Sequence, residues 1–183
     1  MNQETPGGPE IWIRGPVGAA VSPGAISVAP PQSLPDREGQ AASPSPGAAA
    51  FTWMNAHGGA GASTLARVFG GFDAGSHWPD LAAGVPGKIL LVARTHASGL
   101  QAVSRVLDMI RRDEQPSGTF VRAVVLVADA PGRLPAELAK RIKVISSVVE
   151  IHRVPWIAAW RLGDLSSPPP RETSKLSKLI NGQ

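Results

Sequence analysis

The chain has 183 residues, a formal net charge of +4 and no cysteine. The lack of cysteine excludes disulfides, thiolate metal sites and cysteine nucleophiles, and so small a net charge gives no strong indication of nucleic-acid binding. No apolar run reaches the roughly 18 residues that a transmembrane helix requires. The first residues also lack the basic start and apolar block of a secretory signal, so we expect a cytoplasmic protein.

The first 49 residues have the composition of a disordered arm. They hold nine of the eighteen prolines, together with abundant glycine, alanine and serine. Such a segment cannot bury enough apolar surface to offset the entropy lost on ordering. Residues 10–14 (EIWIR) form a short apolar patch between two charged residues. This short patch is either a chance cluster or a docking motif that adds an edge strand to a sheet.

Residues 50–165 alternate strand-like and helix-like patterns, which is typical of βαβ units. Continuous apolar runs predict buried parallel strands, and apolar residues at three- and four-residue spacing predict helices. We expect strands at residues 51–55, 88–94, 121–128 and 148–154, and helices at 63–69, 98–110 and 135–142, with Ser98 as the cap of the second helix. The prediction is an α/β domain with a small, mostly parallel sheet and flanking helices.

Residues 166–183 contain three consecutive prolines near their start and predict a flexible basic tail outside this domain. Within the tail, Leu176, Leu179 and Ile180 lie among two lysines and form a short basic amphipathic turn. A turn of this length is too short to bind lipid firmly by itself. Weak membrane contact is therefore the most that the tail indicates.

The string between the first strand and the first helix carries the strongest chemical signal. The string resembles the end of the phosphate-binding pattern G-x-x-x-x-G-K-S/T, in which main-chain N–H groups surround phosphate oxygens, the lysine bridges phosphates and the hydroxyl binds Mg²⁺. The following helix N-terminus adds a partial positive charge. The loop residues are His57, Gly58, Gly59, Ala60, Gly61, Ala62, Ser63 and Thr64. In a chain so rich in glycine and alanine, the same string also fits a plain strand-to-helix turn.

The loop and its surroundings resemble the MinD/ParA group of P-loop ATPases, whose deviant Walker A motif reads K-G-G-x-G-K-S/T-T. His57 matches the first, partner-reaching lysine and Ala62 matches the second, while Ser63 and Thr64 match the closing hydroxyl pair. The likeness covers residues 51–163 and extends to short, uncharacterised bacterial relatives of the group. Both family lysines are therefore missing from this chain.

This resemblance implies an ATP or ADP site with Mg²⁺ held by Ser63, and it implies a protein partner or a homodimer. Loss of both lysines implies slow hydrolysis or none, because charge neutralisation is central to phosphoryl transfer. We therefore expect a pseudo-ATPase, a regulatory or scaffold module that binds nucleotide or phosphate weakly or not at all. Two alternatives stay open: an active ATPase in which His57 or a partner supplies the missing charge, and a scaffold whose loop binds no ligand.

Acidic residues give a weaker signal. The MinD/ParA group fits two further strands, with Mg²⁺-positioning acids, into the interval that corresponds to residues 70–87. This chain has only Asp73 and Asp80 there, among glycines and prolines that favour a loop. Asp129 follows the strand predicted at residues 121–128. Its role stays open between a local turn, a contact to the nucleotide, and positioning of Mg²⁺ or water.

Overall fold

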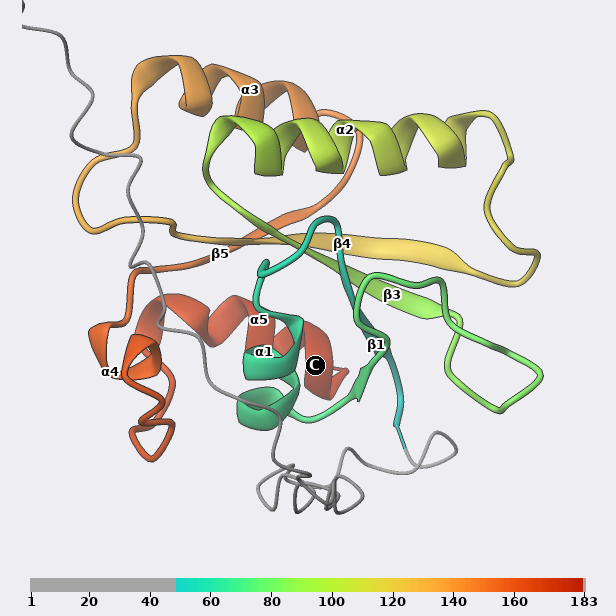
Figure 1. Ribbon diagram of the computed structural model, residues 1–183, viewed down its shortest axis with the longest axis horizontal. Coiled ribbons are helices and arrows are strands. Elements are labelled where there is room, and N and C mark those ends of the chain that lie inside the picture. Colours follow the sequence, from blue (N-terminus) through green and yellow to red (C-terminus); the bar gives the residue numbers. More distant parts are fainter. Residues whose placement is uncertain (1–48, 183) are drawn as a thin grey trace, which may run out of the picture. The chain divides into compact units, whose positions relative to one another are not determined.

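A five-stranded parallel sheet forms the centre of residues 49–182, which are the residues that this computed structural model describes (Figure 1). The strands are β1 (Thr52–Asn55), β2 (Phe72–Asp73), β3 (Lys88–Arg94), β4 (Phe120–Val127) and β5 (Ile151–Val154). The helices are α1 (Ala62–Phe69), α2 (Ala97–Arg111), α3 (Ala136–Ser146), α4 (Ala158–Arg161) and α5 (Ser174–Asn181), with a 3-10 turn η2 (Arg171–Thr173) before α5. The predicted α/β class is confirmed. The arm at residues 1–48, with its EIWIR patch, lies outside the described residues.

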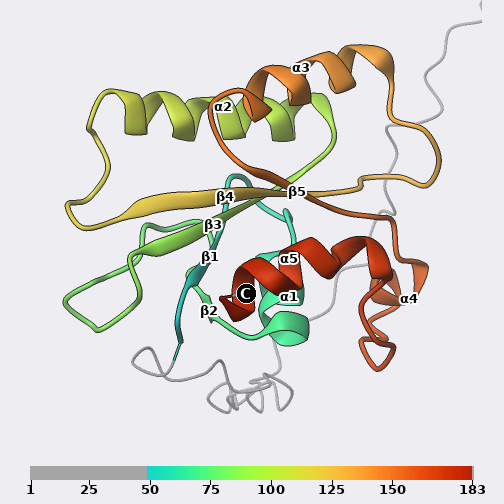
Figure 2. The same ribbon diagram turned by 180° about the vertical axis from the view of Figure 1, so that it is seen from behind.

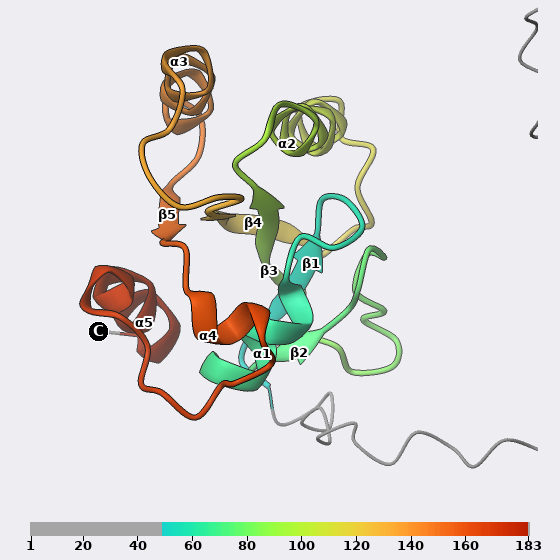
Figure 3. The same ribbon diagram turned by 60° about the vertical axis from the view of Figure 1, so that its left-hand side comes forward.

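Helices cover both faces of the sheet, as Figure 3 shows along the strands. On one face, Leu90 and Val92 of β3 belong to a core cluster with residues of α1 and α5. On the other face, Ile89 and Leu91 pack with residues of α2 and α3. Figure 2 shows α1, α4 and α5 on the side opposite α2 and α3. Because successive side chains of a strand point to opposite faces, the unbroken apolar run of β3 serves both layers.

The strand order is β2-β1-β3-β4-β5, so β1 and β3 are neighbours near the middle of the sheet. From β1 the chain moves outward through α1 to β2. From β3 it moves in the opposite direction through α2, β4 and α3 to β5. Right-handed crossovers in opposite directions place the connecting helices on opposite faces. The order of the strands therefore reverses between β1 and β3, which is where doubly wound sheets open a crevice at their carboxyl edge.

The interval at residues 70–87 differs from the loop that the sequence indicated, because it contains the two-residue strand β2 beside β1. Gly70 and Gly71 have φ values of 72° and 91°, which turn the chain back along β1. A Cβ at Gly71 would lie 2.5 Å from the Phe51 ring, so only glycine fits there. Trp53 fixes the turn by donating from Nε1 to the Gly70 carbonyl at 2.7 Å.

Two element boundaries also differ from expectation. The helix predicted at residues 135–142 continues to Ser146, because Ile145 is buried against the sheet and extends the packed face of α3. The strand predicted at residues 148–154 begins only at Ile151, and Val148 is exposed. The cap of α2 is His96 rather than Ser98. Its Nδ1 accepts the N–H of Gly99 at 2.9 Å.

The expected C-terminal tail instead carries η2 and α5. Leu176 of α5 is fully buried in the same core cluster as Trp53 and Leu65, and Leu179 and Ile180 pack partly against it. The apolar spacing that indicated a short amphipathic turn therefore belongs to a helix whose apolar face covers the sheet. Over residues 49–182, no helix combines the length and the apolar character needed to cross a membrane.

Candidate functional site

Loops from four parallel strands meet at the carboxyl edge of the sheet. The glycine loop follows β1, Thr95 and His96 follow β3, residues 128–135 follow β4, and Pro155 follows β5. Main-chain bonds hold these loops together: the Thr95 N–H donates to the Val127 carbonyl, and the Ala128 N–H donates to the Val154 carbonyl. In open α/β sheets, ligands bind at this edge where the strand order reverses. The glycine loop lies at that point.

The glycine loop has the backbone of a strand-to-helix turn with exposed N–H groups. Gly59 and Gly61 have φ values of 74° and 113°, a region that favours glycine, and α1 begins directly after Gly61. Gly58 has neither a positive φ nor any atom within 4 Å of an added Cβ. The amides of Gly58, Gly59 and Gly61 donate no hydrogen bond to any of residues 49–182. With respect to the described residues, these three amides are available to donate to an anion.

Ala62, at the position of the missing lysine, is part of the core. Its side chain is fully buried with Leu65 and Val92. Its N–H is already used, because it donates to Oδ1 of Asn55 at 3.0 Å. The Asn55 side chain thus satisfies one of the amides that a helix N-terminus leaves unpaired. In this chain, the side chain of Ala62 therefore packs in the core, and its main-chain N–H helps to fix the start of α1.

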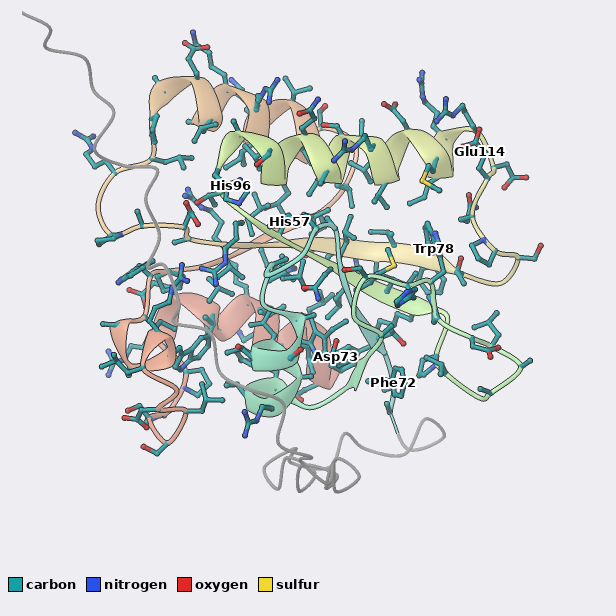
Figure 4. All side chains as sticks on the ribbon, in the orientation of Figure 1. His57, Phe72, Asp73, Trp78, His96 and Glu114 are labelled. Carbon is teal, nitrogen blue, oxygen red and sulfur yellow. The ribbon has the colours of Figure 1, made fainter. Side chains whose placement is uncertain are left out.

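His57 is turned inward and binds the main chain at both ring nitrogens. Nε2 lies 3.1 Å from the N–H of Arg94, and Nδ1 lies 2.9 Å from the Gly58 carbonyl. Only the neutral ring with its proton on Nδ1 can accept from Arg94 and donate to Gly58 at once. The centres of the His57 and His96 rings lie 5.0 Å apart, and Figure 4 shows the two labelled side chains near each other. His57 therefore ties the glycine loop to the end of β3.

The remaining predicted residues have less defined surroundings. Ser63 is exposed on the first turn of α1, and Thr64 lines a small hollow beside the loop. Asp129 is brought to the same edge by its main chain: its N–H donates to Oγ1 of Thr95 at 3.1 Å. Its carboxylate accepts no hydrogen bond from residues 49–182. The side chain is therefore not locked into a local turn.

Two arginines that the sequence did not single out lie at this hollow, which has a volume of about 40 Å³. Arg94, the last residue of β3, donates to the carbonyls of Gly59 at 3.4 Å and Ala128 at 3.2 Å. Arg161 ends α4, with its guanidinium 4.5 Å from the centre of the Trp156 ring. Burial lowers the pKa of Arg94, and the neighbouring charge of Arg161 lowers it further, while Asp129 opposes the shift. In the sequence, the only feature that could have indicated Arg94 as a site residue is its position as a charged residue at the end of a buried strand.

The residues present do not form a resident Mg²⁺ site. Protein-bound Mg²⁺ usually combines one or two carboxylates with water and substrate phosphates. Across residues 49–182, no three His, Cys, Asp or Glu side chains gather where they could hold a metal ion. Asp73, at the end of the edge strand β2, uses Oδ1 to accept the N–H of Gly75 at 2.9 Å. Ser63 alone would offer a single oxygen.

The fold and the site define a doubly wound α/β domain with a glycine-rich turn at the point where the strand order reverses. The chain belongs to a family described as a family of unknown function (DUF6668), whose model matches residues 50–179. That match begins just before β1 and extends into α5. No curated protein and no solved structure matches the chain.

Proposed function

We propose that this protein is a cytoplasmic, MinD/ParA-like module that binds a phosphate group, weakly and without hydrolysing ATP, and that it acts through protein partners. The observation that carries the proposal is the position of the glycine loop. Its exposed Gly58 and Gly59 lie in the loop that leads to α1, beside the point where the strand order reverses, and their N–H groups have no acceptor among residues 49–182. A helix N-terminus with such amides favours an anion.

The absence of hydrolysis follows from the side chains around the loop. Ala62 has no charge, and the neutral His57 ring is committed to main-chain bonds. A charge-assisted hydrogen bond contributes about 1.5–3 kcal/mol, and losing about 3 kcal/mol of transition-state stabilisation slows a reaction somewhat more than a hundredfold. We therefore propose a pseudo-ATPase, with ATP or ADP as the nucleotide. Any Mg²⁺ would arrive with the phosphates, and Ser63 could add one ligand oxygen to it.

The partner and the oligomeric state remain part of the proposal. A module that binds nucleotide without turnover acts through the change in conformational populations that binding causes. Such a change has an effect on the cell only if it alters the affinity of the module for another molecule. A protein partner or a second copy of the chain is the simplest recipient of that change. The resemblance to the MinD/ParA group supports this view.

The test is calorimetric titration of the full chain with ADP and ATP, with and without Mg²⁺, together with a turnover assay. The key variants are Gly58→Glu and Gly58→Gln, because the open space at Gly58 accepts a side chain without strain. The two side chains have the same size and differ in charge. We expect binding by the wild type, a much larger loss with Glu than with Gln, and no turnover. Robust wild-type turnover would favour the active ATPase, and no binding at all would favour the scaffold.

A further inference from the structure

Arg94 and Arg161 come from different layers of the domain and meet beside the glycine loop. Arg94 ends a central strand and Arg161 ends the short helix α4. Both line the same hollow as Gly61 and Thr64. The glycine loop thus contributes Gly61 to the hollow, the two arginines contribute its positive charge, and apolar side chains form most of the remaining lining.

Each of the two guanidinium groups is held by main-chain carbonyls. Arg94 donates to Gly59 and Ala128, and Arg161 donates from Nη2 to the Asp129 carbonyl at 3.3 Å while it lies over the Trp156 ring. These contacts fix the positions of the charges without neutralising them. Guanidinium groups keep further N–H donors in such an arrangement, because each carries five.

Neither arginine has a carboxylate partner in the part of the chain that the structure describes. Within residues 49–182, no Asp or Glu oxygen lies within 4.0 Å of either guanidinium group, whereas Arg111, Arg112 and Arg122 each have such a partner. Asp129 is the acidic residue that affects Arg94 electrostatically, and it does so from a greater distance. Two like charges held close together without a counter-ion repel each other. An anion between them would remove that cost.

We propose that Arg94 and Arg161 form the cationic wall of a phosphate subsite and supply, from the opposite side of the glycine loop, the charge that the missing lysine no longer provides. The inference rests on the proposed function, because it assigns the ligand of the same loop. Its ligand is a phosphate group, borne by a nucleotide or by inorganic phosphate or pyrophosphate. Arginine suits this role, since its planar fork matches the geometry of phosphate oxygens.

The size of the hollow agrees with this ligand. A volume of about 40 Å³ exceeds what a single water molecule needs, roughly 10–15 Å³ on the same measure, and it is far too small for a whole nucleotide. An adjoining hollow of about 410 Å³ shares Ala128, Pro155 and Trp156 with it and also reaches Arg153. A ligand-sized cleft starts at about 300 Å³. A nucleotide can therefore place a phosphate in the small hollow and the rest of the molecule in the larger one.

The experiment is calorimetric titration of the full chain with ADP, ATP, pyrophosphate and inorganic phosphate. The variants are Arg94→Gln and Arg161→Gln, which remove one charge each, and Arg94→Lys and Arg161→Lys, which keep it. The matched control is Arg105→Gln, because Arg105 is exposed on α2 and lines none of these hollows. We expect each Gln variant to weaken phosphate binding about tenfold or more, the Lys variants to weaken it less, and the control to stay within about twofold.

The outcomes separate this inference from the proposed function. If the wild type binds ADP and Gly58→Glu abolishes binding, but Arg161→Gln binds as tightly as the wild type, the arginine subsite is wrong and the proposed function stands. If the wild type binds none of the four compounds, both are wrong. Binding of pyrophosphate as tight as that of ADP supports the subsite and shows that the nucleoside adds little. Arg161 is exposed, so its Gln variant should fold, and thermal unfolding would check this.

Discussion

Two strand-to-helix turns lie next to each other at the carboxyl edge of the sheet, and they are built differently. In the turn from β3 to α2, His96 caps the helix by accepting the N–H of Gly99. A Cβ at Gly99 would lie 2.3 Å from the Arg94 carbonyl oxygen, so packing alone requires this glycine. In the turn from β1 to α1, Gly61 caps the helix without a side chain of its own, although a side chain at the end of β1 accepts one N–H of the first turn, and Gly58 is surrounded by open space.

The two turns therefore contain glycines of different kinds. Close packing requires Gly99, whereas neither packing nor backbone conformation requires Gly58. The turn from β3 to α2 is closely packed and has a side-chain cap, which leaves no room for a ligand. The turn from β1 to α1 keeps N–H donors exposed at a helix N-terminus, where Ser, Thr, Asp or Asn would ordinarily supply the cap. A helix start left open in this way is less stable by itself, and it is available to an anion. The comparison can be tested by changing one turn at a time.

The largest effect is expected from Ala62→Lys, which restores the residue of an ordinary phosphate-binding loop. Because the Ala62 side chain is fully buried in the core, the ammonium group would be placed among apolar side chains. An uncompensated buried charge costs about 3–5 kcal/mol. We expect the free energy of unfolding, measured with urea, to fall by this order and ATP turnover to remain absent. A stable variant that gained turnover would show that the lysine reaches a bound phosphate.

The next effect separates the two turns directly. Gly99→Ala should destabilise the domain by about 1–3 kcal/mol, because the added methyl group clashes with the Arg94 carbonyl even though alanine favours helices. Gly58→Ala should change stability by less than about 0.5 kcal/mol, since no atom lies near its Cβ. Urea unfolding of the two variants measures both values. Equal losses would mean that Gly58 is as structural as Gly99.

The sequence was sufficient for the parts of the fold that depend on local patterns. The run from Lys88 to Arg94 is a buried strand with the expected limits, because continuous apolar residues are informative within one element. The strand β2 was missed since two residues carry no periodicity, and its place depends on a turn against Phe51. The helix α5 was missed because its apolar spacing is short and gains meaning only when Leu176 reaches the core.

The candidate site was predictable on one side only. Glycine spacing indicated the loop, because the chemistry of phosphate cradles requires adjacent residues. The cationic wall combines Arg94 at the end of β3 with Arg161 at the end of α4. These two residues are far apart in the sequence, so no local sequence pattern could predict that they line the same hollow. The match of His57 to a family lysine suggested that its ring could supply the missing charge. The sequence could not show that the ring also accepts the Arg94 N–H, because this contact joins two turns that only the strand order brings together.

A smaller effect is expected from removing this tie. His57→Leu replaces the ring with an apolar group and leaves the Arg94 N–H without its acceptor, which should cost about 1–2 kcal/mol of stability. If the histidine is structural, the affinity for ADP should change less than about threefold, well below one charge-assisted bond. Urea unfolding and calorimetry measure the two quantities separately. Loss of affinity with unchanged stability would instead support the view that His57 replaces the lysine.

The smallest effect is expected from Asp129→Asn, and its sign is informative. The Asp129 carboxylate favours the charged form of Arg94 from a distance, and the two form no ion pair within residues 49–182. A negative charge beside an anion site should weaken binding of the anion. Removing this charge should tighten phosphate binding about two- to fivefold, the range of a solvent-screened interaction of roughly 0.4–1 kcal/mol. The matched control is Asp113→Asn, because Asp113 is exposed at a φ of 59°, which asparagine also tolerates. If Asp129 positions Mg²⁺ or contacts the nucleotide, the same substitution would weaken binding of ATP with Mg²⁺, so the direction of the change decides between these roles.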